Sequence, residues 1–222
     1  MFETKKANEA GIYLIYFYVN GIKTPVLVDD LIPCRGTTPA FCSTNQPELW
    51  AILLEKAWAK LHSNYHDTEG GLGYFASSNM NGVPSYNLNH AFTSESATDE
   101  EREETYRVLK DADRRGYTMM SSSAGLGEEQ SEMGVVSGHA YSLISIHEFE
   151  HEGEEVKLMK LRNPWGSYEW KGDWSDSSEL WTEELREEIG CEETNDGIFH
   201  MTYNDFLDQF KRTSICAVVD NT

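Results

Sequence analysis

The first strongly apolar stretch of the chain, residues 12–19, is made of aromatic, β-branched and other apolar side chains, a composition typical of a β-strand. The Asn20-Gly21 pair that follows favours a type I′ turn, because both positions of this turn require positive φ angles. Residues 24–28 continue as a second strand. Together these segments predict a β-hairpin.

The next apolar pattern has the period of a helix. Pro47 precedes it, and proline is favoured at the first position of a helix. Apolar side chains then recur at i, i+3, i+4 and i+7 spacing, which places them on one face. They are Trp50, Leu53, Leu54, Ala57, Trp58 and Leu61. A helix of this kind must pack its apolar face against a large surface.

Residues 70–96 are rich in Gly, Ser, Asn and Pro and show little periodicity, so we predict a long loop there and a subdomain boundary near Thr93. Thr98 and Glu101 have the spacing of a helix-capping box, and acidic residues in the first turn favour the helix dipole. This helix is expected to end at Gly116 and to be mostly exposed.

Beyond this helix the pattern changes to that of strands separated by turns. The predicted strands cover residues 117–122, 140–147, 156–162, 198–202 and 214–219, and one short helix covers residues 204–210. Antiparallel β-structure therefore dominates this half of the chain, and the fold class is α+β.

The 222 residues carry a net charge of −20, because 38 acidic side chains outnumber 18 basic ones. A surface this acidic repels a phosphate backbone and an anionic membrane, so neither nucleic acid nor a membrane is expected as a partner. The apolar fraction of 39% is sufficient for a substantial buried core.

The cysteines and the polar start of the chain both indicate a reducing, cytoplasmic setting. Association with the cytoskeleton is a separate expectation about location within the cytoplasm. Cys34, Cys42, Cys191 and Cys216 are far apart and form no CxxC pair, so we interpret them as reduced thiols. No apolar stretch reaches the roughly 20 residues of a membrane helix, and residues 1–9 are too polar for a signal peptide.

The segment 147–151, His-Glu-Phe-Glu-His, satisfies the HExxH pattern of zinc metalloproteases. That motif requires a helix, which places the two imidazoles one turn apart on one face. Residues 142–146 are predicted as a strand and Gly153 follows closely, so we interpret the match as a coincidence.

His139 begins one predicted strand, and Asn163 lies at the end of the following one. Side chains in these positions meet when the two strands pair across a turn, and a carboxamide in contact with an imidazole fixes the orientation of the ring. The pair is therefore a candidate for acid–base chemistry, although a lone histidine at a strand start is usually structural.

Three ordered motifs surround this pair: Gly-His-Ala-Tyr-Ser at 138–142, Arg-Asn-Pro-Trp-Gly at 162–166 and Glu-Trp-x-Gly-x-Trp-Ser-Asp at 169–176. They resemble the catalytic core of calpains, which are papain-like cysteine proteases, and the resemblance covers nearly the whole chain. It implies that residues 93–222 form an antiparallel, β-barrel-like subdomain that bears the histidine and asparagine. Residues 1–92 would be the rear part of the cysteine-bearing subdomain, with its hairpin, helix and long loop.

The resemblance implies that His139 is the general base, that Asn163 orients its ring and that Trp165 shields the pair from water. The family carries its nucleophile in a Gly-x-Cys-Trp helix start upstream of the first hairpin, in the same region as the glutamine of its oxyanion hole. No Gly-x-Cys-Trp motif occurs in these 222 residues. None of the four cysteines is predicted at a helix start, where a thiol pKa is lowered, so none is expected to replace the nucleophile.

The calcium site that the family has in this half would use the carboxylates of Glu169, Asp176 and Asp196, and Ca²⁺ prefers such oxygen ligands. Ile198 stands where the family has a glutamate, so a site here would lack one charged oxygen and bind calcium more weakly. The alternative is an ordinary acidic surface. Calcium is the only cofactor that the sequence suggests.

The first functional hypothesis is a catalytically silent calpain-like domain that acts as an interaction or scaffold module in a cytoplasmic assembly, such as a cytoskeletal one. The absent cysteine motivates it. The alternative is a part of an active calcium-dependent cysteine endopeptidase with a protein substrate, whose nucleophile lies in another segment or chain; the retained His139 and Asn163 motivate it. The apolar helix face with Trp50 and Trp58 predicts a protein partner that covers it.

Overall fold

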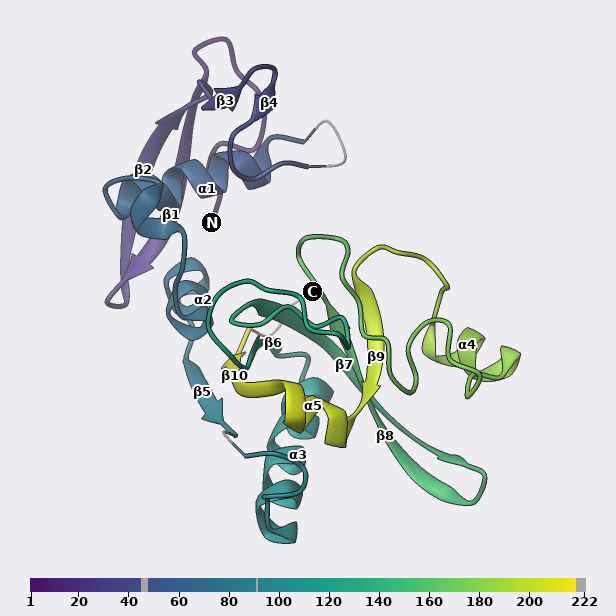
Figure 1. Ribbon diagram of the computed structural model, residues 1–222. Helices are drawn as coiled ribbons and strands as arrows, with labels where there is room; N and C mark the ends of the chain where they lie inside the picture. The colour runs from purple at the N-terminus through teal and green to yellow at the C-terminus, as the bar shows by residue number, and fades with distance from the viewer. Residues whose placement is uncertain (45–47, 91, 219–222) are drawn as a thin grey trace. The chain divides into compact units, whose positions relative to one another are not determined.

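The computed structural model describes residues 1–44, 48–90 and 92–218. Pro47, the predicted helix start, and Val219, the predicted end of the last strand, lie outside the described residues. The chain divides into two compact units, Met1–Pro84 and Ser85–Thr222 (Figure 1). None of the described helices is both long and apolar enough to cross a membrane.

The first unit is built on the predicted hairpin, in which β1 (Ile12–Val19) and β2 (Ile22–Asp29) pair in antiparallel register. Asn20 and Gly21 have φ angles of 51° and 78°, the positive values that a type I′ turn needs. The hairpin prediction is confirmed.

The amphipathic helix α1 (Trp50–Leu61) packs against this hairpin, as its apolar spacing predicts. Leu53 is buried with Phe17 of β1, and the ring of Trp58 lies 5.5 Å from that of Phe17. Trp58 is therefore half-buried against the unit's own core, so it is less exposed than expected from the sequence. Trp50, at the start of the helix, is 55% exposed.

Short elements complete the first unit. They are β3 (Cys34–Arg35), β4 (Thr38–Pro39), the 3₁₀ turn η1 (His66–Thr68) and α2 (Gly73–Asn81), which contacts β1. Gly82 ends α2 with a φ of 69° and lies so close to Tyr18 that a Cβ there would be 2.6 Å from its ring. Only glycine fits this close approach without strain.

The prediction of one long loop over residues 70–96 is wrong, because α2 and the strand β5 (Ser85–Asn89) lie within it. The buried residues of α2 are Ser77 and Asn79, so the helix has no apolar stripe that would reveal it. β5 is held by pairing with a strand distant in sequence, which leaves no local signal. The division between the units precedes β5, whereas the predicted boundary at Thr93 follows it.

The second unit contains a six-stranded sheet in the order β5-β10-β6-β7-β8-β9, with every neighbouring pair antiparallel. Its other strands are β6 (Thr118–Ser123), β7 (Ala140–His151), β8 (Glu154–Arg162), β9 (Ile198–Thr202) and β10 (Phe210–Cys216). The α+β class is confirmed. A barrel requires its edge strands to pair, and in the described ranges β5 and β9 do not. The sheet is open, and the β-barrel-like expectation is wrong.

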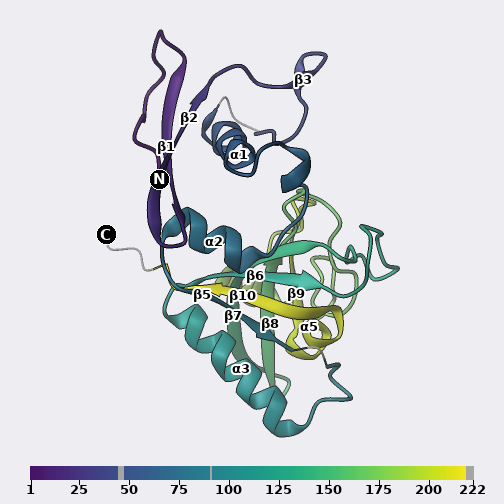
Figure 2. The ribbon, with the colours of Figure 1, turned by 90° about the vertical axis from the view of Figure 1, so that its left-hand side faces the viewer.

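One face of the sheet is covered by α3 (Asp99–Arg114) and α5 (Tyr203–Gln209), which lie on the same side of it (Figure 2). The rings of Tyr106 and Tyr203 join the two helices edge to face, with centroids 4.9 Å apart. Edge-to-face contact is a favoured geometry for aromatic rings, so the two helices form one layer over the sheet.

The predicted capping box of Thr98 and Glu101 begins α3. The expectation that this helix is mostly exposed is wrong for its inner face, where Tyr106, Leu109 and Ala112 are buried in the main core. Glutamate, arginine and aspartate residues fill the outer face, and their number conceals the apolar stripe from a simple reading of composition.

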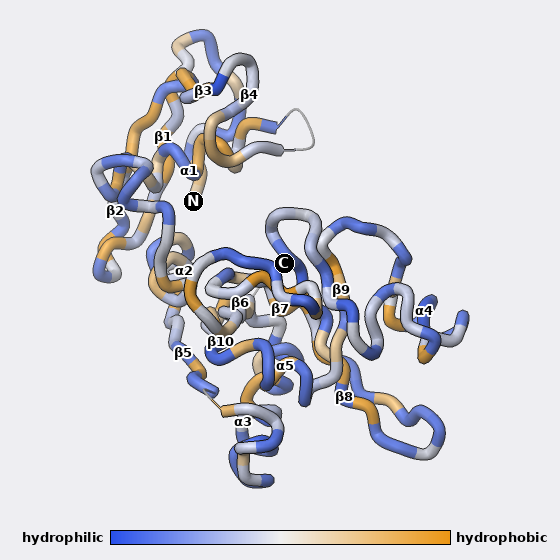
Figure 3. Tube along the Cα trace, viewed as in Figure 1, coloured by the Kyte–Doolittle hydropathy of each residue, from blue (hydrophilic) through white to orange (hydrophobic). Residues whose placement is uncertain are grey.

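The opposite face of β8 and β9 is covered by residues 174–191, including the helix α4 (Glu183–Ile189), which the sequence pattern did not predict. The buried side chains of the hydrophobic cluster on this face are Leu158, Trp174, Trp181, Ile189 and Cys191. Figure 3 shows the hydrophobic positions gathered in the strands and hydrophilic positions in the loops. Because both of its faces are covered, this part of the sheet is the most deeply buried.

His90 follows β5 and fastens this edge of the sheet. The ring is fully buried, and its Nε2 lies 3.0 Å from Oγ1 of Thr213 in β10. The same hydroxyl lies 3.0 Å from Oγ of Ser121 in β6. Burial, assisted by the charge of Lys211, lowers the pKa of His90 to about 4. The ring is therefore neutral in the folded chain at neutral pH.

Replacing this ring should change how stability depends on pH. The unfolded chain protonates His90 near its ordinary pKa of about 6.5, whereas the folded chain does so only at about pH 4. The unfolded state thus binds more protons in this window, and the free energy of unfolding falls as the pH drops through it. We expect His90→Gln to reduce this pH-dependent loss of unfolding free energy by on the order of 2–3 kcal/mol. Urea denaturation near neutral pH and near pH 4 measures it.

The matched control is His66→Gln, because the side chain of His66 is exposed. It should leave the pH dependence of the wild type unchanged. An identical pH dependence for wild type and His90→Gln would contradict the burial argument.

Candidate active site

His139 and Asn163 lie at the same end of neighbouring strands. His139 directly precedes β7 and Asn163 directly follows β8, and the register of the pair matches Ser142 with Arg162. Nε2 of His139 is 3.0 Å from Oδ1 of Asn163. The structure thus brings together the two side chains that the strand pattern places at this edge.

The carboxamide of Asn163 is fully buried, and both its oxygen and its nitrogen make hydrogen bonds. Its Oδ1 also accepts from the backbone N–H of Trp165 at 3.0 Å, and its Nδ2 donates to the carbonyl of Tyr168 at 3.3 Å. These contacts fix the oxygen toward the imidazole, so Nε2 of His139 must carry the proton that it donates. Nδ1 is then the nitrogen left to exchange a proton.

Trp165 lies over the imidazole of His139. The two ring centroids are 4.3 Å apart with an angle of 43° between the planes, and the ring of Tyr141 meets the imidazole edge to face at 5.2 Å. The His139 backbone N–H donates to Oγ of Ser123. His139 is buried while Trp165 remains 47% exposed, so the indole separates the imidazole from solvent on one side.

The sequence reasoning missed Glu128, whose Oε1 lies 3.1 Å from Nδ1 of His139. Its side chain is 57% exposed and belongs to the loop between β6 and β7. The Oγ of Ser137 holds this loop by donating to the carbonyls of Gly127 and Glu129. No local pattern indicated the contact, because it depends on the folded course of the loop. A carboxylate therefore occupies the nitrogen that a catalytic thiol would need.

No cysteine takes that position. In the part of the chain that the structure describes, the hydrogen-bond partners of the His139 ring are Glu128 and Asn163, which account for both nitrogens. Burial, followed by the charge of Asp176, raises the pKa of the Cys191 thiol to about 11. A thiol with a raised pKa is protonated and a poor nucleophile.

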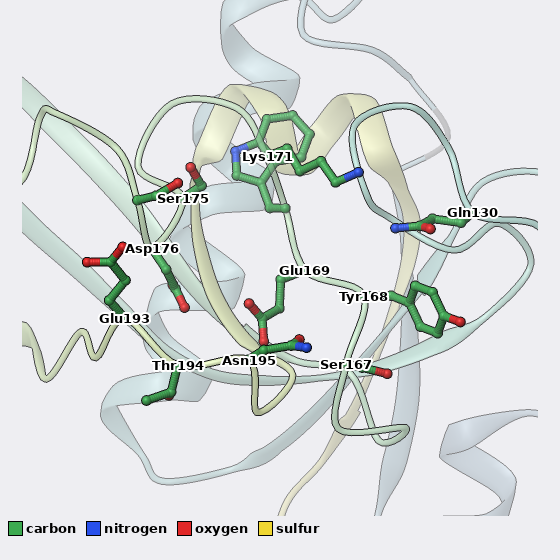
Figure 4. Close-up of a pocket in the computed structure, with 12 residues that line it drawn as sticks. Gln130, Ser167, Tyr168, Glu169, Lys171, Ser175, Asp176, Glu193, Thr194 and Asn195 are labelled. Carbon is green, nitrogen blue, oxygen red and sulfur yellow. The ribbon is translucent and has the colours of Figure 1, made fainter.

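Two of the three predicted calcium ligands, Glu169 and Asp176, line a hollow of about 650 Å³, and Figure 4 shows their carboxylates directed toward it, whereas Asp196 lines a neighbouring cavity. Oε1 of Glu169 accepts from the backbone N–H of Gly197 at 2.7 Å, and Oδ1 of Asp196 accepts from that of Ile198 at 2.8 Å. Burial, then the charges of Glu169 and Asp196, raises the pKa of Asp176 to about 7.

This carboxylate cluster fits a hard cation. Oδ2 of Asp176 is buried with no hydrogen-bond partner among the described residues, and the negative charges of Glu169 and Asp196 act on this carboxyl against the positive charge of Arg186. Such an arrangement is unfavourable alone and favourable around Ca²⁺. The side chain of Ile198 offers no oxygen, and Glu193 is a further carboxylate that lines the hollow with Glu169 and Asp176.

The HExxH match is not a metal site of the metalloprotease kind. His147 and His151 both lie on strand β7 rather than on a helix. Nε2 of His147 is 2.9 Å from Oγ of Ser145, and His151 packs edge to face on Trp174. The interpretation of this motif as a coincidence is confirmed.

Comparison with known proteins identifies relatives of one kind. Residues 1–217 match the family model described as calpain family cysteine protease. The chain is 35% identical over 220 residues to the calpain-type cysteine protease ADL1 of Oryza sativa subsp. japonica, covering 97% of this chain and 10% of that protein. It is 34% identical to calpain-9 of Rattus norvegicus, over 96% of this chain and 32% of that protein. It is 36% identical to human calpain-14, over 94% of this chain and 30% of that protein. The chain thus spans from a tenth to a third of these relatives.

Proposed function

Because the chain belongs to the calpain family of cysteine proteases, we propose that it carries the His/Asn half of a peptide-hydrolysing site whose thiol comes from polypeptide outside these 222 residues. The observation that carries the proposal is the 3.0 Å contact between His139 Nε2 and Asn163 Oδ1. It leaves Nδ1 free to take a proton once Glu128 moves aside. On its own, the chain would not hydrolyse peptides.

In this proposal a thiol proton passes to Nδ1 of His139, and the thiolate attacks the carbonyl carbon of the scissile peptide bond. The imidazolium then gives the proton to the leaving amine as the C–N bond breaks, and water hydrolyses the thioester with His139 again as base. Asn163 holds the ring in the productive orientation throughout, and Trp165 excludes water from one side.

The chain alone should therefore not cleave peptides, because loss of the nucleophile removes on the order of thousands-fold or more in rate. Adding a Cys-bearing segment of the family in trans should restore cleavage of a fluorogenic peptide, and a thiol-reactive probe should block it. His139→Ala should abolish the restored activity, whereas His151→Ala, on the same strand but outside the pair, should retain it.

Two results would count against this proposal. One is turnover by the isolated chain that the thiol probe blocks, since a cysteine of the chain would then be the nucleophile. The other is failure to restore cleavage when circular dichroism shows that both partners are folded.

A second function, an interaction module, is favoured by an apolar hollow within the first unit. The hollow has a volume of about 670 Å³. Its lining includes Phe2, Leu49 and Trp50, with Lys5 and Lys6 beside them. A protein segment that combines apolar and acidic side chains fits this lining. We extend the proposal to a partner in a cytoplasmic assembly, cytoskeletal or other.

If this hollow is a partner site, the isolated chain should bind a hydrophobic dye there, and Trp50→Ser should lower dye fluorescence severalfold. Leu126→Ser is the matched control, because Leu126 is exposed and lies in the second unit. A monodisperse monomer that binds no dye would argue against a partner at this surface.

We also propose that Glu169, Asp176 and Asp196 bind calcium, with an affinity lowered by Ile198. Replacing Asp176 by asparagine relieves the repulsion among the three carboxylates, so Asp176→Asn should melt about 2–4 °C above the wild type in chelator if the relief is about 1 kcal/mol. Added calcium should raise the melting temperature of the wild type more than that of the variant.

Glu179→Gln removes an exposed charge outside the cluster and is the matched control. It should respond to calcium as the wild type does. Equal calcium responses in wild type and Asp176→Asn would contradict calcium binding at this cluster.

A further inference from the structure

A second group of metal-ligand side chains lies beside the acidic cluster and shares one residue with it. Asp176, Cys191 and His200 come from the loop before α4, the residue after its cap and strand β9. Their carboxylate, thiol and imidazole donor atoms all lie within 4.8 Å of one another. None of the motifs in the sequence combines these three residues, because they are brought together only by the fold.

His200 is buried without a hydrogen-bond partner. It is 1% exposed, and neither Nδ1 nor Nε2 has a partner among the described residues. Its strand position explains the burial: Phe199 and Met201 point into the main core, so His200 points to the other face, against the ring of Trp181 at 5.2 Å. Leaving both ring nitrogens unpaired in the interior is costly, and a bound ion removes part of that cost.

The ring is in the form that binds metals. Burial, followed by the charge of Lys160, lowers the pKa of His200 to about 3, so the imidazole is neutral at physiological pH. Oδ2 of Asp176 is the other buried atom here without a partner. The carboxylate of Asp176 and the imidazole of His200, which come from distant parts of the chain, thus both offer unpaired metal-ligand atoms close to the sulfur of Cys191.

Two basic side chains near this point are held by other acceptors. Lys160 Nζ donates to the carbonyl of Gly190 at 2.9 Å, and Arg186 Nη2 donates to the carbonyl of Asp176 at 2.6 Å. Arg186 Nη1 also lies 3.4 Å from the Cys191 sulfur. An ion bound to the sulfur must replace this last contact, while the guanidinium keeps its carbonyl partner.

The donor set selects the class of ion. Sulfur with imidazole nitrogen and one carboxylate suits a borderline-soft divalent ion such as Zn²⁺, whereas Ca²⁺ takes oxygen ligands only. Metal–ligand distances of 2.0–2.3 Å in tetrahedral geometry place donor atoms about 3.3–3.8 Å apart, so donor atoms that lie within 4.8 Å of one another need to approach by at most about 1.5 Å. A cavity of about 220 Å³, lined by Asp176, Glu192 and His200, leaves space for a water as the fourth ligand.

We propose that Asp176, Cys191 and His200 bind one zinc-class divalent ion, with the fourth position open to water. Binding releases the thiol proton of Cys191 to solvent, because a thiol that coordinates such an ion is deprotonated. The ion would fasten strand β9 to the end of α4 and to the loop that carries Asp176. Because Asp176 also belongs to the acidic cluster, an ion on the cysteine side would draw this carboxylate away from calcium.

Cobalt substitution tests the proposal directly. Co²⁺ added to the metal-free full chain should give the visible spectrum of a tetrahedral ion together with a thiolate-to-cobalt charge-transfer band, and Zn²⁺ should abolish both. Cys191→Ser should lose the charge-transfer band, and His200→Gln should weaken Zn²⁺ binding on the order of 100-fold or more, measured by calorimetry.

The matched control is the double variant Cys34→Ser with Cys42→Ser, which removes the more accessible thiols and should bind as the wild type does. Since the buried substitutions could disturb folding, the wild type provides an independent measurement: anomalous scattering at the zinc edge should locate one ion between Asp176, Cys191 and His200. An octahedral cobalt spectrum without the band, a band that persists in Cys191→Ser, or an anomalous peak elsewhere would each overturn the proposal.

Discussion

The buried carboxamide of Asn163 is the contact on which the geometry of the candidate active site depends. Its oxygen accepts from both His139 and Trp165, and its nitrogen donates to the carbonyl of Tyr168. A buried amide with every group paired has one favourable orientation, since a flip would leave donors facing donors. The orientation of the imidazole, and of the indole that covers it, therefore follows from one side chain at the end of β8.

The backbone of Gly197 links the His139–Asn163 pair to the acidic cluster of Glu169, Asp176 and Asp196. Its carbonyl accepts from the backbone N–H of Asn163 at 2.7 Å, and its own N–H donates to Glu169 at 2.7 Å. Gly197 has a φ of 86°, and a Cβ here would lie 2.7 Å from the Asn163 carbonyl oxygen. Only glycine allows this approach. A cation that repositions the Glu169 carboxylate thus acts on the same residue whose carbonyl holds the backbone of Asn163.

Local signals made part of this structure predictable. The Asn20-Gly21 turn and the capping box of Thr98 specify their elements within a few residues. The positions of His139 before one predicted strand and Asn163 after the next indicated their contact, although the two strands are longer than predicted and are joined by a shorter turn. The missed features rest on long-range contacts instead. β5 is stabilised by β10, and the open sheet follows from the order of strands rather than from any one of them.

The contact of Glu128 with His139 explains how this site stays ordered without a thiol. A thiolate and a carboxylate both offer a negative charge to Nδ1, and an imidazole with acceptors at both nitrogens satisfies both when it is doubly protonated. An ordered His/Asn pair is therefore compatible with a silent chain as well as with an active one. Glu128 is more than half exposed, however, so water already solvates much of its carboxylate and can replace the contact with the buried imidazole. A thiol that reaches Nδ1 therefore displaces the carboxylate at little energetic cost, so the contact with Glu128 maintains the site without closing it.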